Sequence, residues 1–185
     1  SIEGMGGEIN AYTTRAAPTF YAATLTEHAQ STLHLIAEMV LEPTFRKEET
    51  DKERTVIFDE IESYNDSPSE LIYDDFESLV FNGHPLAMPI LGTRKTLRRI
   101  SSKPDYALNW MRKHYRPERM VVFCQGNIRP ERFFRLAEKE FGHLKSTLIP
   151  TVTRQSPDGQ PTDSYAATYT RHTHQVHAML GGKAY

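Results

Sequence analysis

The chain has 185 residues, of which 38% are hydrophobic and 25% are charged. This length can hold one domain with a hydrophobic core, with room for the start of a second domain. A formal net charge of -2 gives no electrostatic support for a nucleic-acid-binding protein or for binding to an anionic membrane. The single cysteine, Cys124, excludes a disulfide within the chain, and no apolar run reaches the roughly 18 residues of a membrane span.

The first part of the chain predicts a helical turn, two strands and a helix. Gly6 and Gly7 favour the end of a short helical segment. Residues 9–15 alternate between apolar and polar side chains, and residues 19–25 are rich in β-formers, so both predict strands. Thr26 is a suitable N-cap for the helix that follows. The apolar stripe of that helix, which we interpret as core, consists of Ala29, Leu33, Ile36, Ala37, Val40 and Leu41.

Two further helices and a loop are predicted next. Apolar residues recur at helical spacing over residues 47–64, and a second helix begins at Ser67 or Pro68 and ends near Phe81. Residues 84–93 contain turn formers without periodicity and predict a loop. Its histidine, His84, precedes a proline, and we interpret it as structural rather than as a metal ligand.

The third part predicts a helix, a strand and a helix. Pro104 opens the first helix, residues 119–125 form the strand, and residues 130–141 form a helix that Gly142 ends. Cys124 follows an apolar run and is interpreted as a buried structural thiol. One face of the helix after Pro104 carries Tyr106, Trp110, Met111 and His114.

The last part of the chain contains a competing metal candidate. Residues 146–163 are rich in proline and polar residues and predict a linker, and residues 164–180 resume strand character. On a strand, His172 and His174 share one face and His177 takes the other. A zinc site needs a third ligand that the linker does not supply, so we interpret these histidines as polar strand residues.

The helix predicted over residues 47–64 carries two carboxylates in an unusual place. Glu53 and Glu60 are seven residues apart, so they lie on nearly one line, together with Ile57 and Ile61. A stripe of this kind should face a core, where an uncompensated carboxylate costs several kcal/mol. Either both glutamates lie at the edge of the stripe and pair with Arg or Lys, or one of them is a metal ligand and the other supports it.

A family resemblance bears on this choice. Four blocks occur in order: the GGEINAYT of residues 6–13, the helix with Glu53 and Glu60, the HPL of residues 84–86 and the PILGT of residues 89–93. Their order and spacing resemble the pitrilysin-type zinc peptidases, the inverzincins, close to the mitochondrial processing peptidase branch. The resemblance covers most of the chain and weakens toward the end.

The resemblance implies a zinc site that this sequence holds only in part. In the family, an H-x-x-E-H motif supplies two histidine ligands and a catalytic glutamate, and a glutamate on a later helix completes the site. Glu60 matches the later ligand, and Glu53 matches the supporting, catalytically important glutamate before it. No H-x-x-E-H occurs in the 185 residues, and the family places it about seventy-five residues before the later glutamate, which is upstream of Ser1. We therefore expect a fragment whose parent holds zinc and which binds none and is inactive by itself.

The resemblance also implies a substrate site, a fold and a set of partners. Asn10 and Ala11 match an edge strand to which family members add a peptide substrate as a further strand. The expected fold class is α+β, an antiparallel sheet covered by helices, with residues 1–145 as most of the first peptidase domain. Residues 146–163 form the linker, and residues 164–185 start the next domain or form a last strand. The expected partners are a peptide or protein substrate and further subunits, as a homo- or hetero-oligomer. Nucleic acid and a transmembrane segment are not expected, and the cytoplasm is favoured over the periplasm or an organelle.

Two alternatives remain open from the sequence. In one, the chain belongs to a non-catalytic subunit of the same fold, which would bind peptides or act as a scaffold for an active partner. In the other, it is a helical interaction module, in which case Glu53 and Glu60 would be exposed surface residues. That last alternative leaves the order of the four blocks unexplained.

Overall fold

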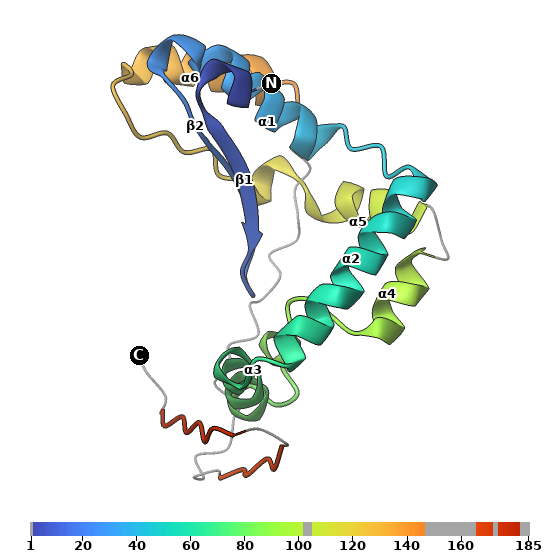
Figure 1. The fold of residues 1–185 in the computed structure, drawn as a ribbon. Coiled ribbons are helices and arrows are strands. Elements are labelled where there is room, and N and C mark those ends of the chain that lie inside the picture. Colours follow the sequence, from blue (N-terminus) through green and yellow to red (C-terminus); the bar gives the residue numbers. More distant parts are fainter. Residues whose placement is uncertain (1, 102–104, 147–165, 172–173, 182–185) are drawn as a thin grey trace. The chain divides into compact units, whose positions relative to one another are not determined.

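The computed structural model describes residues 2–101, 105–146, 166–171 and 174–181 (Figure 1). The chain forms two compact units. The first unit comprises residues 1–46 and 103–152, and the second comprises residues 47–102 and 153–185. Each unit is thus built from two stretches that are far apart in the sequence.

The first unit begins with a β-hairpin. A 3-10 turn, η1 (Glu3–Met5), ends at Gly6, whose φ of 72° lies in the left-handed region that favours glycine. Strand β1 (Glu8–Thr13) then pairs with strand β2 (Pro18–Ala23) in an antiparallel register (Figure 1). The strands predicted at residues 9–15 and 19–25 are confirmed, each ending two residues earlier than predicted.

Three helices accompany the hairpin in this unit. A 3-10 turn, η2 (Thr26–His28), leads into α1 (Ala29–Leu41), which packs against β2 and against α6 (Pro130–Phe141). Helix α5 (Asp105–His114) is followed by the 3-10 turn η4 (Pro117–Arg119). The helices predicted after Thr26, from Pro104 and over residues 130–141 are therefore present. On α5 the rings of two residues from the predicted face, Trp110 and His114, lie 4.6 Å apart.

The predicted cap at Thr26 is wrong, because the chain is already helical there. Thr26 opens a 3-10 turn, the residue that precedes α1 is His28, and no side chain caps that helix end. A different threonine ties the helix to the hairpin. Thr32 is 8% exposed, and its hydroxyl donates to the His28 carbonyl at 2.9 Å and lies 3.0 Å from the Thr24 hydroxyl.

The first stretch of the second unit is helical over most of its described residues. Helix α2 (Lys47–Asn65) packs against α3 (Pro68–Val80) and α4 (Arg94–Ser101), and α3 packs against the 3-10 turn η3 (Pro85–Ala87) (Figure 1). Leu71 on α3 is buried. The predicted bounds of α2 and α3 are confirmed to within one or two residues, because periodicity and proline mark both helices. Helix α4 was not predicted, because its eight residues are too few to show a period.

Two predicted strands are absent from the described residues. Residues 120–125 have no regular secondary structure, and Val121 and Phe123 are 92% and 80% exposed. Residues 166–171 and 174–181 of the predicted strand 164–180 are likewise irregular. A strand needs a hydrogen-bonded neighbour, and among the described residues the only sheet is the two-stranded hairpin. The interpretation of Cys124 as a buried thiol is wrong for the same reason, since its side chain is exposed.

The α+β class is confirmed, with an antiparallel sheet and a helix packed against it. Residues 147–163 of the predicted linker lie outside the described residues, so the domain boundaries stay a prediction. In the part of the chain that the structure describes, no helix combines the length and apolar character needed to cross a membrane.

A histidine joins two helices of the first unit. His34 Nδ1 on α1 lies 2.9 Å from Glu140 Oε2 on α6, and His34 Nε2 lies 4.0 Å from Glu38 Oε1. The hydrogen bond with Glu140, assisted by the charges of both carboxylates, raises the pKa of His34 above its ordinary 6.5. Burial and the positive charge of Lys139 lower the pKa of His34, but each by less than the contact with Glu140 raises it.

We predict that this pair makes the stability of the α1–α6 contact depend on pH. A raised pKa in the folded state means that the contribution is fully present below pH 6.5 and is lost as the pH rises through the raised value. Glu140→Gln should move the His34 pKa back toward its ordinary value and flatten the pH dependence of thermal unfolding between about pH 5 and 8. An NMR titration of the imidazole measures the pKa directly. Glu131→Gln, on the first turn of α6, is the control and should change neither quantity. An unchanged His34 pKa in Glu140→Gln would contradict the prediction.

Candidate functional site

Helix α2 presents both candidate glutamates to solvent. At about 100° per residue, Glu53 and Glu60 are separated by only about 20° around the helix axis. Both side chains are exposed, and no residue of α2 is buried. Ile57 and Ile61, which share their stripe, are half-buried. The expectation that this stripe faces a core is therefore wrong, since the helix is strongly polar and its apolar residues are too few to bury it.

Neither glutamate is paired with a cation within the described residues. No hydrogen bond or ion pair joins Glu53 or Glu60 to another described side chain, so the interpretation in which Arg or Lys neutralises them is not supported. Two carboxylates on one line, both exposed, offer oxygen atoms that can accept a cation or a hydrogen-bond donor. Exposure of both glutamates is also what a helical interaction module would show.

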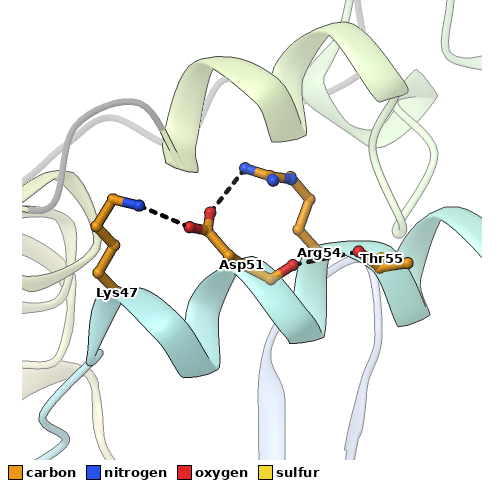
Figure 2. Close-up of polar contacts among 4 residues, drawn as sticks. All are labelled: Lys47, Asp51, Arg54 and Thr55. Carbon is orange, nitrogen blue, oxygen red and sulfur yellow. Dashed lines mark hydrogen bonds and ion pairs between the residues drawn. The ribbon is translucent and has the colours of Figure 1, made fainter.

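The opposite face of α2 is occupied by side-chain pairs. Lys47 Nζ and Arg54 Nη1 donate to the two oxygens of Asp51, each at 2.9 Å (Figure 2). The hydrogen bond from Lys47 holds the pKa of Asp51 below its ordinary 3.8, and the same contact raises the pKa of Lys47. Thr55 Oγ1 donates to the Asp51 carbonyl at 3.3 Å. These contacts all lie within the helix and stabilise its first half.

The second half of α2 is tied to the neighbouring helices. The hydroxyl of Tyr64 donates to the carbonyl of Glu70 on α3 at 3.0 Å. Glu62 accepts a hydrogen bond from Arg94 on α4, and the Arg94 guanidinium lies over the ring of Phe58. Sequence reasoning did not identify this contact with Arg94. The only signal for it was the run of basic residues at 94–99, in a segment where no helix was predicted.

The candidate substrate residues lie on β1. Asn10 is opposite Tyr21 and Ala11 is opposite Phe20, and both candidates are exposed. Beyond the end of the ladder the Thr14 amide donates to the Ala17 carbonyl at 3.0 Å, which sets the alternation of hydrogen-bonded and non-hydrogen-bonded pairs.

It follows that the Ala11 amide points away from β2. Hydrogen-bonded pairs recur at every second residue of an antiparallel strand. Starting from the Thr14–Ala17 pair, this makes Asn10 and Tyr21 a hydrogen-bonded pair and Ala11 and Phe20 a non-hydrogen-bonded pair. The outward Ala11 N–H donates to the side-chain oxygen of Asn10 at 2.8 Å. The Ala11 amide is thus a donor on the outer edge of β1 that is occupied by the side chain of Asn10. A hydrogen bond therefore links the two candidate residues.

The histidine candidates do not form a metal site among the described residues. His84 accepts a hydrogen bond from the Leu86 amide at 3.2 Å and caps η3, so its structural interpretation is confirmed. His172 lies outside the described residues, His174 is exposed, and His177 Nε2 lies 3.1 Å from Gln175 Oε1. In the ranges that the structure describes, no three His, Cys, Asp or Glu side chains are grouped so as to hold a metal ion.

Comparison with known protein families identifies the chain over most of its length. Residues 1–94, which include β1, β2 and α2, match the family model described as insulinase, peptidase family M16. Residues 103–184 match the model described as the peptidase M16 inactive domain. All four sequence blocks lie within residues 1–94 and are therefore explained by one family.

Curated relatives carry protease names. The chain is 33% identical over 183 residues to the uncharacterized zinc protease YmxG of Bacillus subtilis, covering 99% of this chain and 43% of that protein. It is 36% identical over 143 residues to an uncharacterized zinc protease of Rickettsia bellii, covering 77% and 34%. It is 32% identical over 144 residues to the beta subunit of the mitochondrial-processing peptidase of Caenorhabditis elegans, covering 78% and 31%.

Solved structures support the same fold. A protease from Helicobacter pylori superposes with a TM-score of 0.71 at 23% identity, covering 81% of this chain and 36% of that one. An M16-like peptidase from Alicyclobacillus acidocaldarius gives a TM-score of 0.64 at 25% identity, covering 80% and 34%. The chain spans less than half the length of the relatives and structures that it matches. Because one family model accounts for residues 1–94, including the hairpin and the helix with both glutamates, the chain belongs to peptidase family M16.

Proposed function

We propose that these residues form part of a zinc-dependent metalloendopeptidase that hydrolyses peptide bonds. The observation that carries the proposal is the placement of Glu60, an exposed carboxylate on α2 with no ion pair among the described residues, within the stretch that matches the family. The protease names of the relatives support the same activity for the longer protein. Zinc accepts a carboxylate oxygen as one of its ligands, so the chemistry of Glu60 fits the metal.

In this proposal Glu60 supplies one of at least three protein ligands. The other two are the histidines of an H-x-x-E-H segment, which this sequence does not contain. Bound zinc would supply Lewis-acid activation of a water molecule. Glu53 lies two turns before Glu60, and both side chains extend from nearly the same line of the helix. Its role in this proposal is to orient the site by hydrogen bonding.

We further propose that a peptide substrate adds to the outer edge of β1. Backbone donors and acceptors of a free edge can pair with an extended peptide whatever its sequence. The Ala11 amide is one such donor, and a peptide that uses it must take the place of the Asn10 side chain. The side-chain amide of Asn10 is then free to contact the peptide instead.

The proposal extends to partners. Relatives named as subunits of a processing peptidase support assembly with further chains, and the exposed Val121 and Phe123 offer apolar surface to them. The second candidate is a non-catalytic subunit of the same fold. It requires that no H-x-x-E-H precede Ser1 in the encoding gene, and sequencing that region decides between the two.

We predict graded effects for three variants of the longer polypeptide that includes H-x-x-E-H. Glu60→Gln should abolish tight zinc binding and peptide hydrolysis, because an amide is a poor zinc ligand. Glu53→Gln should retain zinc and lose about 10–100-fold in activity. Glu48→Gln, an exposed carboxylate on the first turn of α2, is the control and should resemble the wild type. Zinc content by metal analysis and hydrolysis of a quenched peptide are the measurements. Wild-type zinc content and activity in all three variants would refute the assignment.

A second prediction tests the edge of β1. Ala11→Pro removes the outward N–H and leaves the hydrogen bonds to β2 in place, since the Ala11 amide takes no part in them. In the longer polypeptide that includes H-x-x-E-H, we expect peptide hydrolysis to lose most of its kcat/KM while the far-ultraviolet circular dichroism is unchanged. Ala11→Gly keeps the N–H and should retain most of the activity. If the proline variant hydrolyses peptides as the wild type does, the substrate binds elsewhere.

The 185-residue chain by itself should hold no stoichiometric zinc and hydrolyse no peptide. One carboxylate ligand cannot replace the three protein ligands that zinc sites use. The chain is purified in zinc-containing buffer, dialysed and analysed for metal. One tightly held zinc per chain would show that the ligand set proposed above is wrong.

A further inference from the structure

The orientation of α2 is set by contacts at its surface. None of its 19 residues is buried, so the usual apolar core does not fix the rotation of this helix about its axis. What remains is its packing against α3 and α4, the helices that its second half contacts through named side chains. Specific polar and aromatic contacts therefore determine the position and rotation of α2 to a greater extent than they would in a well-buried helix.

Arg94 on α4 makes two contacts with α2. Its Cζ lies 4.8 Å from the centroid of the Phe58 ring, within the range of a cation–π interaction, and its guanidinium donates to Glu62. Arg98, one turn later, lies 6.0 Å from the same ring. Phe58 and Glu62 are one turn apart, so Arg94 contacts α2 along a short line on one face.

That line is opposite the two candidate glutamates. At about 100° per residue, Glu60 lies about 160° from both Phe58 and Glu62 around the helix axis. Glu53 lies about 140° from Phe58 by the same measure. A contact that fixes Phe58 and Glu62 against α4 must therefore point the glutamates away from α4, and rotation of α2 would move all four side chains together.

We propose that Arg94 is a positioning residue for Glu60. It holds Phe58 and Glu62 against α4 and so fixes the direction in which the carboxylate of Glu60 extends from α2. The proposal rests on the proposed function, in which Glu60 is a zinc ligand, and it adds a determinant of metal affinity on a different helix that has no contact with the metal.

Electrostatics and positioning make opposite predictions for the loss of Arg94. Removing a positive charge near the site should strengthen the binding of a cation, if charge alone acts. Removing a positioning contact should weaken it. Lys95 is the next residue on α4, is exposed, and carries the same charge, but among the described residues the cations that contact Phe58 and Glu62 are Arg94 and Arg98. It is therefore the matched control.

The experiment measures zinc affinity by chelator competition in the longer polypeptide that includes H-x-x-E-H, well below its melting temperature. We expect Arg94→Ala to bind zinc about 3–10-fold more weakly than the wild type, in line with the modest energies of an exposed ion pair and a cation–π contact. Lys95→Ala should bind zinc as tightly as the wild type or slightly more tightly. Arg94→Lys keeps the charge and part of the contact, so its affinity should fall between those of Arg94→Ala and the wild type.

A second variant covers the case in which Arg94→Ala does not fold. Phe58→Leu keeps an apolar side chain of similar size and removes the ring face on which the guanidinium lies, so it should weaken zinc binding without removing any charge. A purely structural role would lower the melting temperature and leave the affinity of the folded molecules unchanged. Equal affinities in Arg94→Ala and Lys95→Ala, or unchanged affinity in Phe58→Leu, would overturn the proposal.

The failure of this inference is distinguishable from the failure of the proposed function. If Glu60→Gln retains wild-type zinc affinity, the metal site is misassigned, whatever the Arg94 variants show. If Glu60→Gln loses zinc and Arg94→Ala does not, the metal site stands and the positioning role of Arg94 is wrong.

Discussion

The period of the α-helix is the constraint on which the second unit depends. Because about seven residues complete two turns, α2 can place Glu53 and Glu60 on one line and keep a separate set of contacts on the other side. Asp51, with its two cationic partners, stabilises the helix from that other side. No residue of the helix is buried, and the line with the glutamates stays open to solvent.

The first unit is joined by polar contacts of a different kind. The hairpin is connected to α1 through hydroxyls, since Thr32 joins the end of β2 to the first turn of the helix. Helix α1 is in turn connected to α6 through the imidazole of His34 and the carboxylate of Glu140. The polar side chains that connect the hairpin and these helices thus range from buried, at Thr32, to exposed, at His34.

Much of the fold could be predicted from the sequence, for identifiable reasons. The bounds of α2 and α3 follow from apolar periodicity and from Pro68, which is compatible only with the first turn of a helix. The strand predicted at 119–125 failed because apolar character indicates a strand only where a partner exists to complete the ladder. The same reason explains the exposed Cys124.

The candidate site was predictable only in its local part. The common line of Glu53 and Glu60 follows from their spacing, which every helix imposes. The exposure of these two glutamates depends on which elements pack against α2, and those elements lie elsewhere in the sequence. The contact between Glu62 and Arg94 joins residues 32 positions apart, and charge pattern alone does not pair them.

The bond between the Ala11 amide and the Asn10 side chain has a consequence for the behaviour of the protein in concentrated solution. A bare strand edge is a template for another copy of the same chain, and natural proteins protect such edges against aggregation. Here the protecting acceptor is a side chain on the strand itself, which can rotate away. This one donor of the edge is therefore occupied until a segment offers the Ala11 amide a better acceptor than Asn10 does.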